Sequence, residues 1–142
     1  MIDVSVTSAR SDASDAIRNG IRQALHDAGQ AGLAESQREV PVAFGDLKES
    51  GELRRSDTQA TFGYRAGHAP FVEFGTDPHW PPIKPLKDWA ALVLGDEDAA
   101  YAVQQKIAER GTPAQPFMDP GFRVAVRELK RRGLSTSIEG EL

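Results

Sequence analysis

Four prolines within eight positions, at 78, 81, 82 and 85, constrain this 142-residue chain more than any other feature. Proline fixes φ and lacks a backbone N–H group, so neither a helix interior nor a central strand can pass through this segment. We therefore expect residues 77–85 to form an ordered turn or an exposed arm. Trp80 lies inside this arm, and we interpret it either as an interface contact or as part of a local core.

The part of the chain before the arm combines one strand, one long helix and a hairpin. Residues 2–7 alternate apolar and polar side chains, which is the period of a strand. A helix is predicted over residues 12–38 or so, with N-caps at Ser11 or Asp12 and an end before Pro41. Its apolar stripe, interpreted as core, is Ile17, Ile21, Leu25 and Ala28.

The rest of this first part is expected to be loop and sheet. Residues 43–51 are polar and predict a loop. Residues 52–56 and 58–64 are typical of two antiparallel strands, and we place the sheet at about 50–76.

After the arm the pattern is helical. Residues of about 86–110 predict helix with a break at Gly95, where Asp96 can cap the second segment. A last helix is expected over about 119–132, with Asp119 as its N-cap. Residues 111–116 are a proline-containing linker, and residues 133–142 are a tail that either adds a strand or stays irregular. A chain of this length fits a single domain, 1–142.

Composition excludes several classes of protein. Without cysteine there is no disulfide, no thiolate nucleophile and no cysteine-ligated zinc. A net charge of −4 and a pI near 5.4 argue against tight binding to DNA phosphates. No run of about 18 apolar residues is long enough to span a membrane. The first residues do not look like a secretory signal, so synthesis in the cytoplasm is the simplest interpretation.

The sequence carries no motif for catalysis or for a cofactor. Nucleotide-binding loops and the common hydrolase motifs are missing. The best candidates for metal ligands are Glu73, Asp77 and His79, but no two histidines share a helix face. We therefore predict no catalytic residue, no metal site and no cofactor.

Three segments, taken in order, resemble one family. Residues 51–56 read G-E-L-R-R-S, residues 68–76 read H-A-P-F-V-E-F-G-T, and residues 116–122 read P-F-M-D-P-G-F. This order resembles the tail-completion and head–tail joining family of tailed phages named after gene product ten of phage Hong Kong 97, over roughly residues 12–132. His68 stands where the family usually has Tyr, Gly121 where Ala is common, and the 78–111 insert is longer than in many members.

The resemblance implies an α+β fold in which a long N-terminal helix packs on a curved antiparallel sheet, with further helices in the C-terminal half. It implies a non-enzymatic virion protein whose copies form a ring, commonly of six, in the neck of a tailed virus. Its partners would be the head-side connector or adaptor and the tail tube or tail terminator, with DNA passing through without sequence-specific binding.

Three other functions stay open at this point. They are a head-completion adaptor, a soluble assembly or nucleic-acid-binding factor, and a small metal-dependent hydrolase.

The same resemblance points to interface residues. We expect Gly75 to adopt a positive φ, and Glu73 to be either a buried partner of an arginine or an inter-subunit hydrogen-bonding group. Phe71, Phe74 and Phe117 are expected to pack together and to clamp the middle of the chain to the last helix. The 77–85 arm and the 111–116 linker are expected at contacts. The full set of predicted contact residues is Phe71, Glu73, Phe74, Gly75, Thr76, Trp80, Arg54, Arg55, Pro116 and Phe117.

Overall fold

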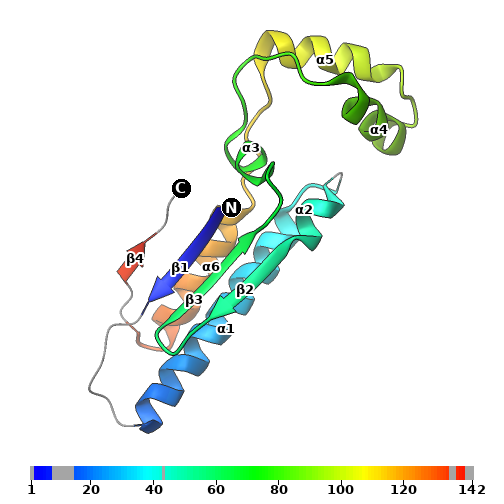
Figure 1. Cartoon of the computed structure of the whole chain (residues 1–142). Coiled ribbons are helices and arrows are strands. Elements are labelled where there is room, and N and C mark those ends of the chain that lie inside the picture. The colour runs from blue at the N-terminus through cyan, green and yellow to red at the C-terminus, as the bar shows by residue number, and fades with distance from the viewer. Residues whose placement is uncertain (1, 8–14, 43, 135–136, 140–142) are drawn as a thin grey trace.

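A computed structural model describes residues 2–7, 15–42, 44–134 and 137–139. The chain is α+β, as expected, and its elements follow one another as seen in Figure 1. In chain order they are β1 (Ile2–Thr7), α1 (Asp15–Glu39), α2 (Gly45–Glu49), β2 (Gly51–Arg55), β3 (Gln59–Tyr64), α3 (Ala69–Phe74), α4 (Ile83–Leu94), α5 (Ala99–Arg110), α6 (Met118–Arg131) and β4 (Ser137–Glu139).

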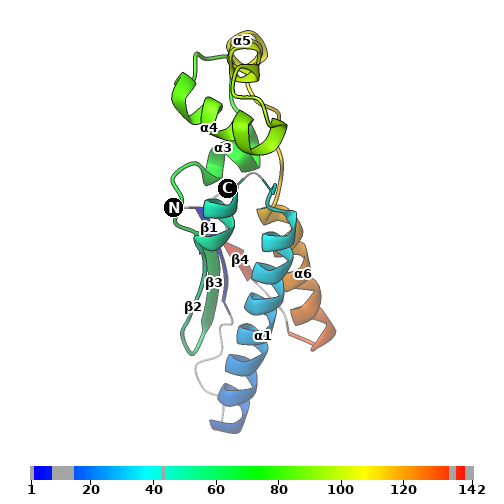
Figure 2. The same ribbon diagram turned by 90° about the vertical axis from the view of Figure 1, so that its right-hand side faces the viewer.

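The sheet is antiparallel with strand order β2-β3-β1-β4. Val4 of β1 lies opposite Phe62 of β3, and both are buried. The next pair, Ser5 and Thr61, faces the other side of the sheet, where their hydroxyl oxygens lie 2.6 Å apart. Figure 2 shows α1 and α6 on the same side of the sheet. One face therefore covers the core and the other face is polar, as alternation predicts for an antiparallel sheet.

The long helix is confirmed as α1, although its expected N-caps at 11 and 12 lie outside the described residues. Leu25 and Ala28 are buried, whereas Ile17 near the start of α1 is half exposed. The innermost face of α1 carries small side chains four residues apart, so that α6 can approach closely. These are Ala24, Ala28, Gly32 and Ser36.

The crossing of α1 and α6 explains one departure from the family pattern. A Cβ atom at Gly121 of α6 would overlap the Gly32 carbonyl oxygen and lie 2.8 Å from the Ser36 Cβ. An alanine at 121 therefore does not fit at this helix separation. Beside the crossing, the Ser36 and Tyr64 hydroxyl oxygens form a buried hydrogen bond of 2.8 Å that joins α1 to β3.

Two predicted assignments were wrong. The sheet was expected to continue to about residue 76, but residues 69–74 form the short helix α3, with Pro70 in its first turn, where a missing N–H costs nothing. The loop expected at 43–51 contains the short helix α2, which exists because Leu47 is fully buried against the core. Each is a single turn or so, too short to show helical periodicity.

The C-terminal half contains two helices between the arm and α6, as the break at Gly95 predicted. The first begins at Ile83, three residues earlier than expected, so Pro85 lies in its first turn. Helices α4 and α5 contact each other and form a helical hairpin, residues 77–111, that stands away from the sheet and its helices, beyond α3 (Figures 1 and 2). The two helices cross rather than run antiparallel, because Figure 2 looks along α5 while α4 extends across the view. The tail does add a strand, because β4 pairs with β1 at the sheet edge.

The α1–α6 crossing yields a stability prediction. Replacing Gly121 by Ala should lower the free energy of unfolding by about 1–3 kcal/mol, because the methyl group overpacks the crossing. Gly20→Ala is the matched control. Gly20 has no atom within 4 Å of its would-be Cβ, so that change should raise stability by about 0.5–1 kcal/mol. Urea unfolding of the three proteins measures both effects, and equal stability of the Gly121→Ala and natural proteins would contradict the packing account.

Candidate assembly interface

Glu73 is the buried acid at the centre of the site, with 4% of its surface exposed. Its carboxylate accepts three backbone hydrogen bonds from the start of α6. The Phe117 N–H lies 2.7 Å and the Met118 N–H 2.9 Å from one oxygen, and the Asp119 N–H lies 3.3 Å from the other. Glu73 was expected to pair with an arginine or with a neighbouring subunit. Its partners are instead backbone groups of its own chain.

This arrangement replaces the helix cap that was predicted from sequence. The first N–H groups of a helix have no partner within the helix and carry partial positive charge, which favours an anion there. Asp119 was expected to supply that cap, but it lies inside α6 and pairs with Arg123 at 2.8 Å. The capping acid comes from α3, 44 residues earlier in the chain.

Phe117 lies immediately before α6 and is fully buried. Its ring meets Tyr64 edge-on, with ring centres 4.9 Å apart. Burial raises the pKa of the Tyr64 phenol. The Ser36 hydrogen bond opposes that shift, and the negative charge of Glu73 adds to it. The start of α6 is thus held by an apolar ring contact next to the charged cap.

The expected three-phenylalanine clamp was wrong. Phe117 is in the core, but Phe71 is 59% exposed and Phe74 is 54% exposed. The reason is the helix at 69–74, which turns Val72 and Glu73 inward and the two phenylalanines outward. Phe71 and Phe74 are therefore surface groups, available for contact with another molecule.

The helical hairpin joins the rest of the chain through two crossing segments. Thr76 and Thr112 form an antiparallel bridge, with backbone hydrogen bonds of 3.0 and 3.2 Å and hydroxyl oxygens 2.9 Å apart. Gly75 and Gly111 precede them with φ of 75° and 70°. A Cβ at Gly75 would lie 2.5 Å from the Thr112 carbonyl oxygen, and one at Gly111 would overlap that of Thr76. Only glycine fits at both positions.

Sequence reasoning found Gly75 and Thr76 but missed their partners. The signal was present, because Gly75-Thr76 and Gly111-Thr112 are the same dipeptide, each followed within two residues by a proline. The expected positive φ at Gly75 is confirmed. Ser36 and Tyr64 were also missed, since nothing in the sequence pairs a serine with a tyrosine 28 residues away.

The remaining predicted contact residues lie on the surface. Arg54 on β2 pairs with Asp3 at 3.0 Å and with Glu52 at 3.4 Å, and Arg55 is exposed beside it. Trp80 is 70% exposed, which removes the local-core interpretation. Pro116 is exposed in the linker that leads to α6.

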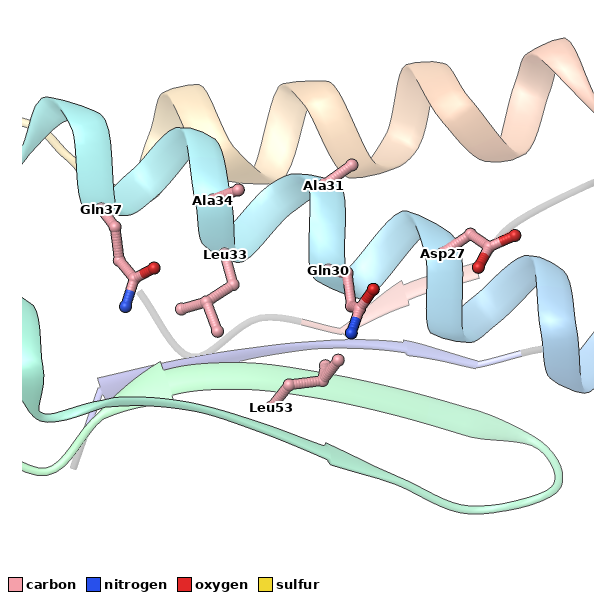
Figure 3. Close-up of a pocket in the computed structure, with 7 residues that line it drawn as sticks. All are labelled: Asp27, Gln30, Ala31, Leu33, Ala34, Gln37 and Leu53. Carbon is pink, nitrogen blue, oxygen red and sulfur yellow. The ribbon is translucent and has the colours of Figure 1, made fainter.

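Several hollows lie on the surface of the described residues, and two of them are large. One, of about 500 Å³, is a shallow groove between α1 and the edge strand β2, where Figure 3 shows Leu33 and Leu53 with polar side chains around them. The other, of about 620 Å³, lies at the base of the helical hairpin. Its apolar lining residues are Phe44, Phe71, Val72, Pro78, Pro81, Ile107 and Pro113.

The residues weighed as metal ligands do not come together. The Glu73 carboxylate is occupied by the start of α6, and the His79 ring lies 2.9 Å from the Asp77 backbone oxygen, not from its carboxylate. Among the described residues, no three His, Asp or Glu side chains are grouped as a metal ion would need. Within the same residues, no helix has the length and apolar character that a membrane crossing requires.

Comparison with known families agrees with this geometry. Residues 7–75 match the model of a family described as "Bacteriophage HK97-gp10, putative tail-component". The expected resemblance is confirmed over this range. A search of curated proteins and a search of solved structures found no match.

The matched range is informative about the fold. It contains α1, α2, β2, β3 and α3, and therefore both Glu73 and the segment at 51–56. It ends at Gly75, where the chain leaves for the helical hairpin. The third segment of the expected resemblance, at 116–122, lies outside it, although Glu73 binds that segment directly.

Phe117 is buried and Phe74 is half exposed, so replacing each by alanine should affect stability very differently. Phe117→Ala should lower the free energy of unfolding by about 3–5 kcal/mol, because it leaves a cavity beside Tyr64. Phe74→Ala serves as the matched control and should change it by less than about 0.5 kcal/mol, because the ring is already in water. Thermal unfolding of the two variants checks this. Comparable losses of stability would support the expected packing of Phe74 with Phe117.

A second prediction concerns the cap. Glu73→Gln keeps the shape of the side chain but turns one acceptor oxygen into an amide donor that faces backbone N–H groups. The free energy of unfolding should fall by about 1–3 kcal/mol. Glu49→Gln, on the exposed end of α2, should cost almost nothing. A Glu73→Gln protein that unfolds like the natural one would mean that the carboxylate does not hold α6.

Proposed function

We propose that this chain is a structural subunit of an oligomeric ring in the neck of a tailed virus, where it joins the connector of the DNA-filled head to the tail. The observation that carries the proposal is a match to a phage tail-component family in a chain whose added hairpin exposes large apolar side chains. Trp80 is 70% exposed and Leu92 is 79% exposed. Large apolar groups exposed close together in the chain are typical of assembly contacts.

Ring formation is favoured by the sheet. Strands β2 and β4 are its two edges, and open edges are a liability that closed assemblies remove. A heterologous contact between copies closes into a ring when the rotation is right, and we propose six copies. The chain is proposed to act as one domain, made in the host cytoplasm and located in the virion neck.

The proposed partners are the head-side connector or adaptor and the tail tube or tail terminator. DNA would pass through the ring without being read. The net charge of −4 supports passage without tight binding. We propose Trp80, Phe71, Phe74, Arg55 and Pro116 as contact residues, because all five are exposed. Glu73, Gly75, Thr76 and Phe117 would act indirectly, by holding the contact surface in place.

Two other structural functions compete with this one. A head-completion adaptor would also be a neck protein, and a soluble assembly factor would be missing from finished particles. A hydrolase that uses Glu73, Asp77 and His79 is disfavoured, because the carboxylate of Glu73 is bound to backbone N–H groups. We propose that the chain has no catalytic activity.

Deletion of the gene tests the proposal. Cells that produce particles without this chain should accumulate filled heads and separate tails, and a plasmid copy should restore joined particles. His79→Ala should restore joining as well as the natural chain does, because no chemistry depends on that ring. Electron microscopy counts the three species, and peptide analysis of purified particles detects the chain. Normal joined particles after deletion, or finished particles without the chain, would contradict the function.

A further inference from the structure

Strand β2 is an edge of the sheet, and the ladder that joins it to β3 fixes which of its backbone groups stay open. The Ser56 N–H donates to the Gln59 carbonyl oxygen at 2.8 Å, and the Arg65 N–H donates to the Ser50 carbonyl oxygen at 3.2 Å. Bonded pairs alternate along an antiparallel ladder. The even-numbered residues of β2 therefore bond to β3, and the odd-numbered ones point their N–H and C=O groups the other way.

Three residues of β2 thus present unused hydrogen-bonding groups along one edge. Among the described residues no strand pairs with this edge, since β2 ends the strand order. Figure 1 shows β2 at one side of the sheet. An open edge of this kind is a template for another strand. The three residues are Gly51, Leu53 and Arg55.

A groove flanks this edge on the inner face of the sheet. It is the hollow of about 500 Å³ between α1 and β2, where the partly buried Leu33 and Leu53 lie with polar side chains around them (Figure 3). A strand that paired with β2 would place every second side chain over this groove. The edge therefore offers both backbone bonds and an apolar place for side chains, as sites of strand addition do.

The sequence of β2 is complementary to itself. When two copies of β2 run antiparallel across a two-fold axis, three registers bond at least two of the outward-pointing residues of each copy. Centring on Glu52 or on Arg54 places that charge opposite its twin, which is destabilising. Centring on Leu53 places Glu52 opposite Arg54 and Gly51 opposite Arg55. Only this register bonds all three outward-pointing residues and opposes unlike charges.

We propose that two copies of the chain pair through their β2 edges, with Leu53 of each copy opposite Leu53 of the other. The two four-stranded sheets become one antiparallel sheet with both α1 helices on the same side. The two grooves meet at the axis and cover Leu33 and Leu53 of both copies. Within each chain Glu52 already pairs with Arg54 at 3.4 Å and with Arg65, so pairing merges two networks of ion pairs.

This pairing goes beyond the proposed ring and does not depend on it. A two-fold contact uses the same surface of both copies, so it makes a closed pair and cannot close a ring by itself. The pair therefore belongs to the free chain, before assembly. There it keeps the β2 edge from pairing with other chains.

Cross-linking tests the register, because the natural chain has no cysteine. Leu53→Cys places two thiols opposite each other on residues whose Cα atoms are about 5.5 Å apart, which suits a disulfide. Mild oxidation should give a linked dimer and nothing larger. Arg55→Cys is the matched control on the same strand. Its twin lies four residues away, or about 13 Å along the strand, so it should stay unlinked. Equal linking of the two variants would overturn the register.

A second variant tests the backbone bonds without a cysteine. Arg55→Pro removes an N–H that points away from β3, so it leaves the β2–β3 ladder intact. It should weaken dimerisation about tenfold or more, because each pair loses two hydrogen bonds. Arg55→Ala removes the charge but keeps the N–H, and should dimerise as the natural chain does. Sedimentation across a concentration series measures both, and urea unfolding checks that each monomer is intact.

The outcomes separate this inference from the proposed function. A natural chain that stays monomeric at its highest soluble concentration overturns the pairing and leaves the ring standing, and so does a dimer that Arg55→Pro does not weaken. Open-ended oligomers would mean that β2 pairs with β4 of the next copy, which also overturns the two-fold pair. A dimer in solution with no ring in particles would uphold the pairing and contradict the proposed function alone.

Discussion

The carboxylate of Glu73 at the start of α6 is the contact on which the rest of the arrangement depends. It ties α3 to a helix that begins 45 residues later, and so closes the loop that contains the whole helical hairpin. A second bond runs alongside, from the Gln115 N–H to the Val72 carbonyl oxygen at 2.8 Å. Because α6 packs along α1, the same anchor also sets where the covering helices lie on the sheet.

The anchor separates two kinds of surface. On one side lies the α/β part, which buries two apolar clusters between the α1–α6 pair and the inner face of the sheet. On the other side lies the hairpin, which buries few apolar side chains and exposes several large ones. The Thr76–Thr112 bridge joins them, with a glycine before each threonine. A packed α/β part that carries a hairpin with exposed apolar side chains suits a subunit whose neighbours cover those side chains.

Local pattern was enough to predict much of this fold. The strand at 2–7, the long helix, the β2–β3 hairpin and the break at Gly95 all follow from periods and breakers within a few residues. What could not be predicted depends on distant partners. Asp119-Pro120 is a plausible cap by itself, and only the tertiary structure shows that Glu73 takes that place. Phe71, Phe74 and Phe117 look alike in sequence, but the short helix at 69–74 decides which of them meet water. The bridge partner of Thr76 lies 36 residues away.

The most direct test of the proposed ring is a reconstruction of the particle neck at a resolution that allows the chain to be traced. We predict a closed ring of identical copies between the head connector and the tail, each with the Glu73 carboxylate on its own α6. A neck without this chain, or single copies bound only to unlike proteins, would contradict it.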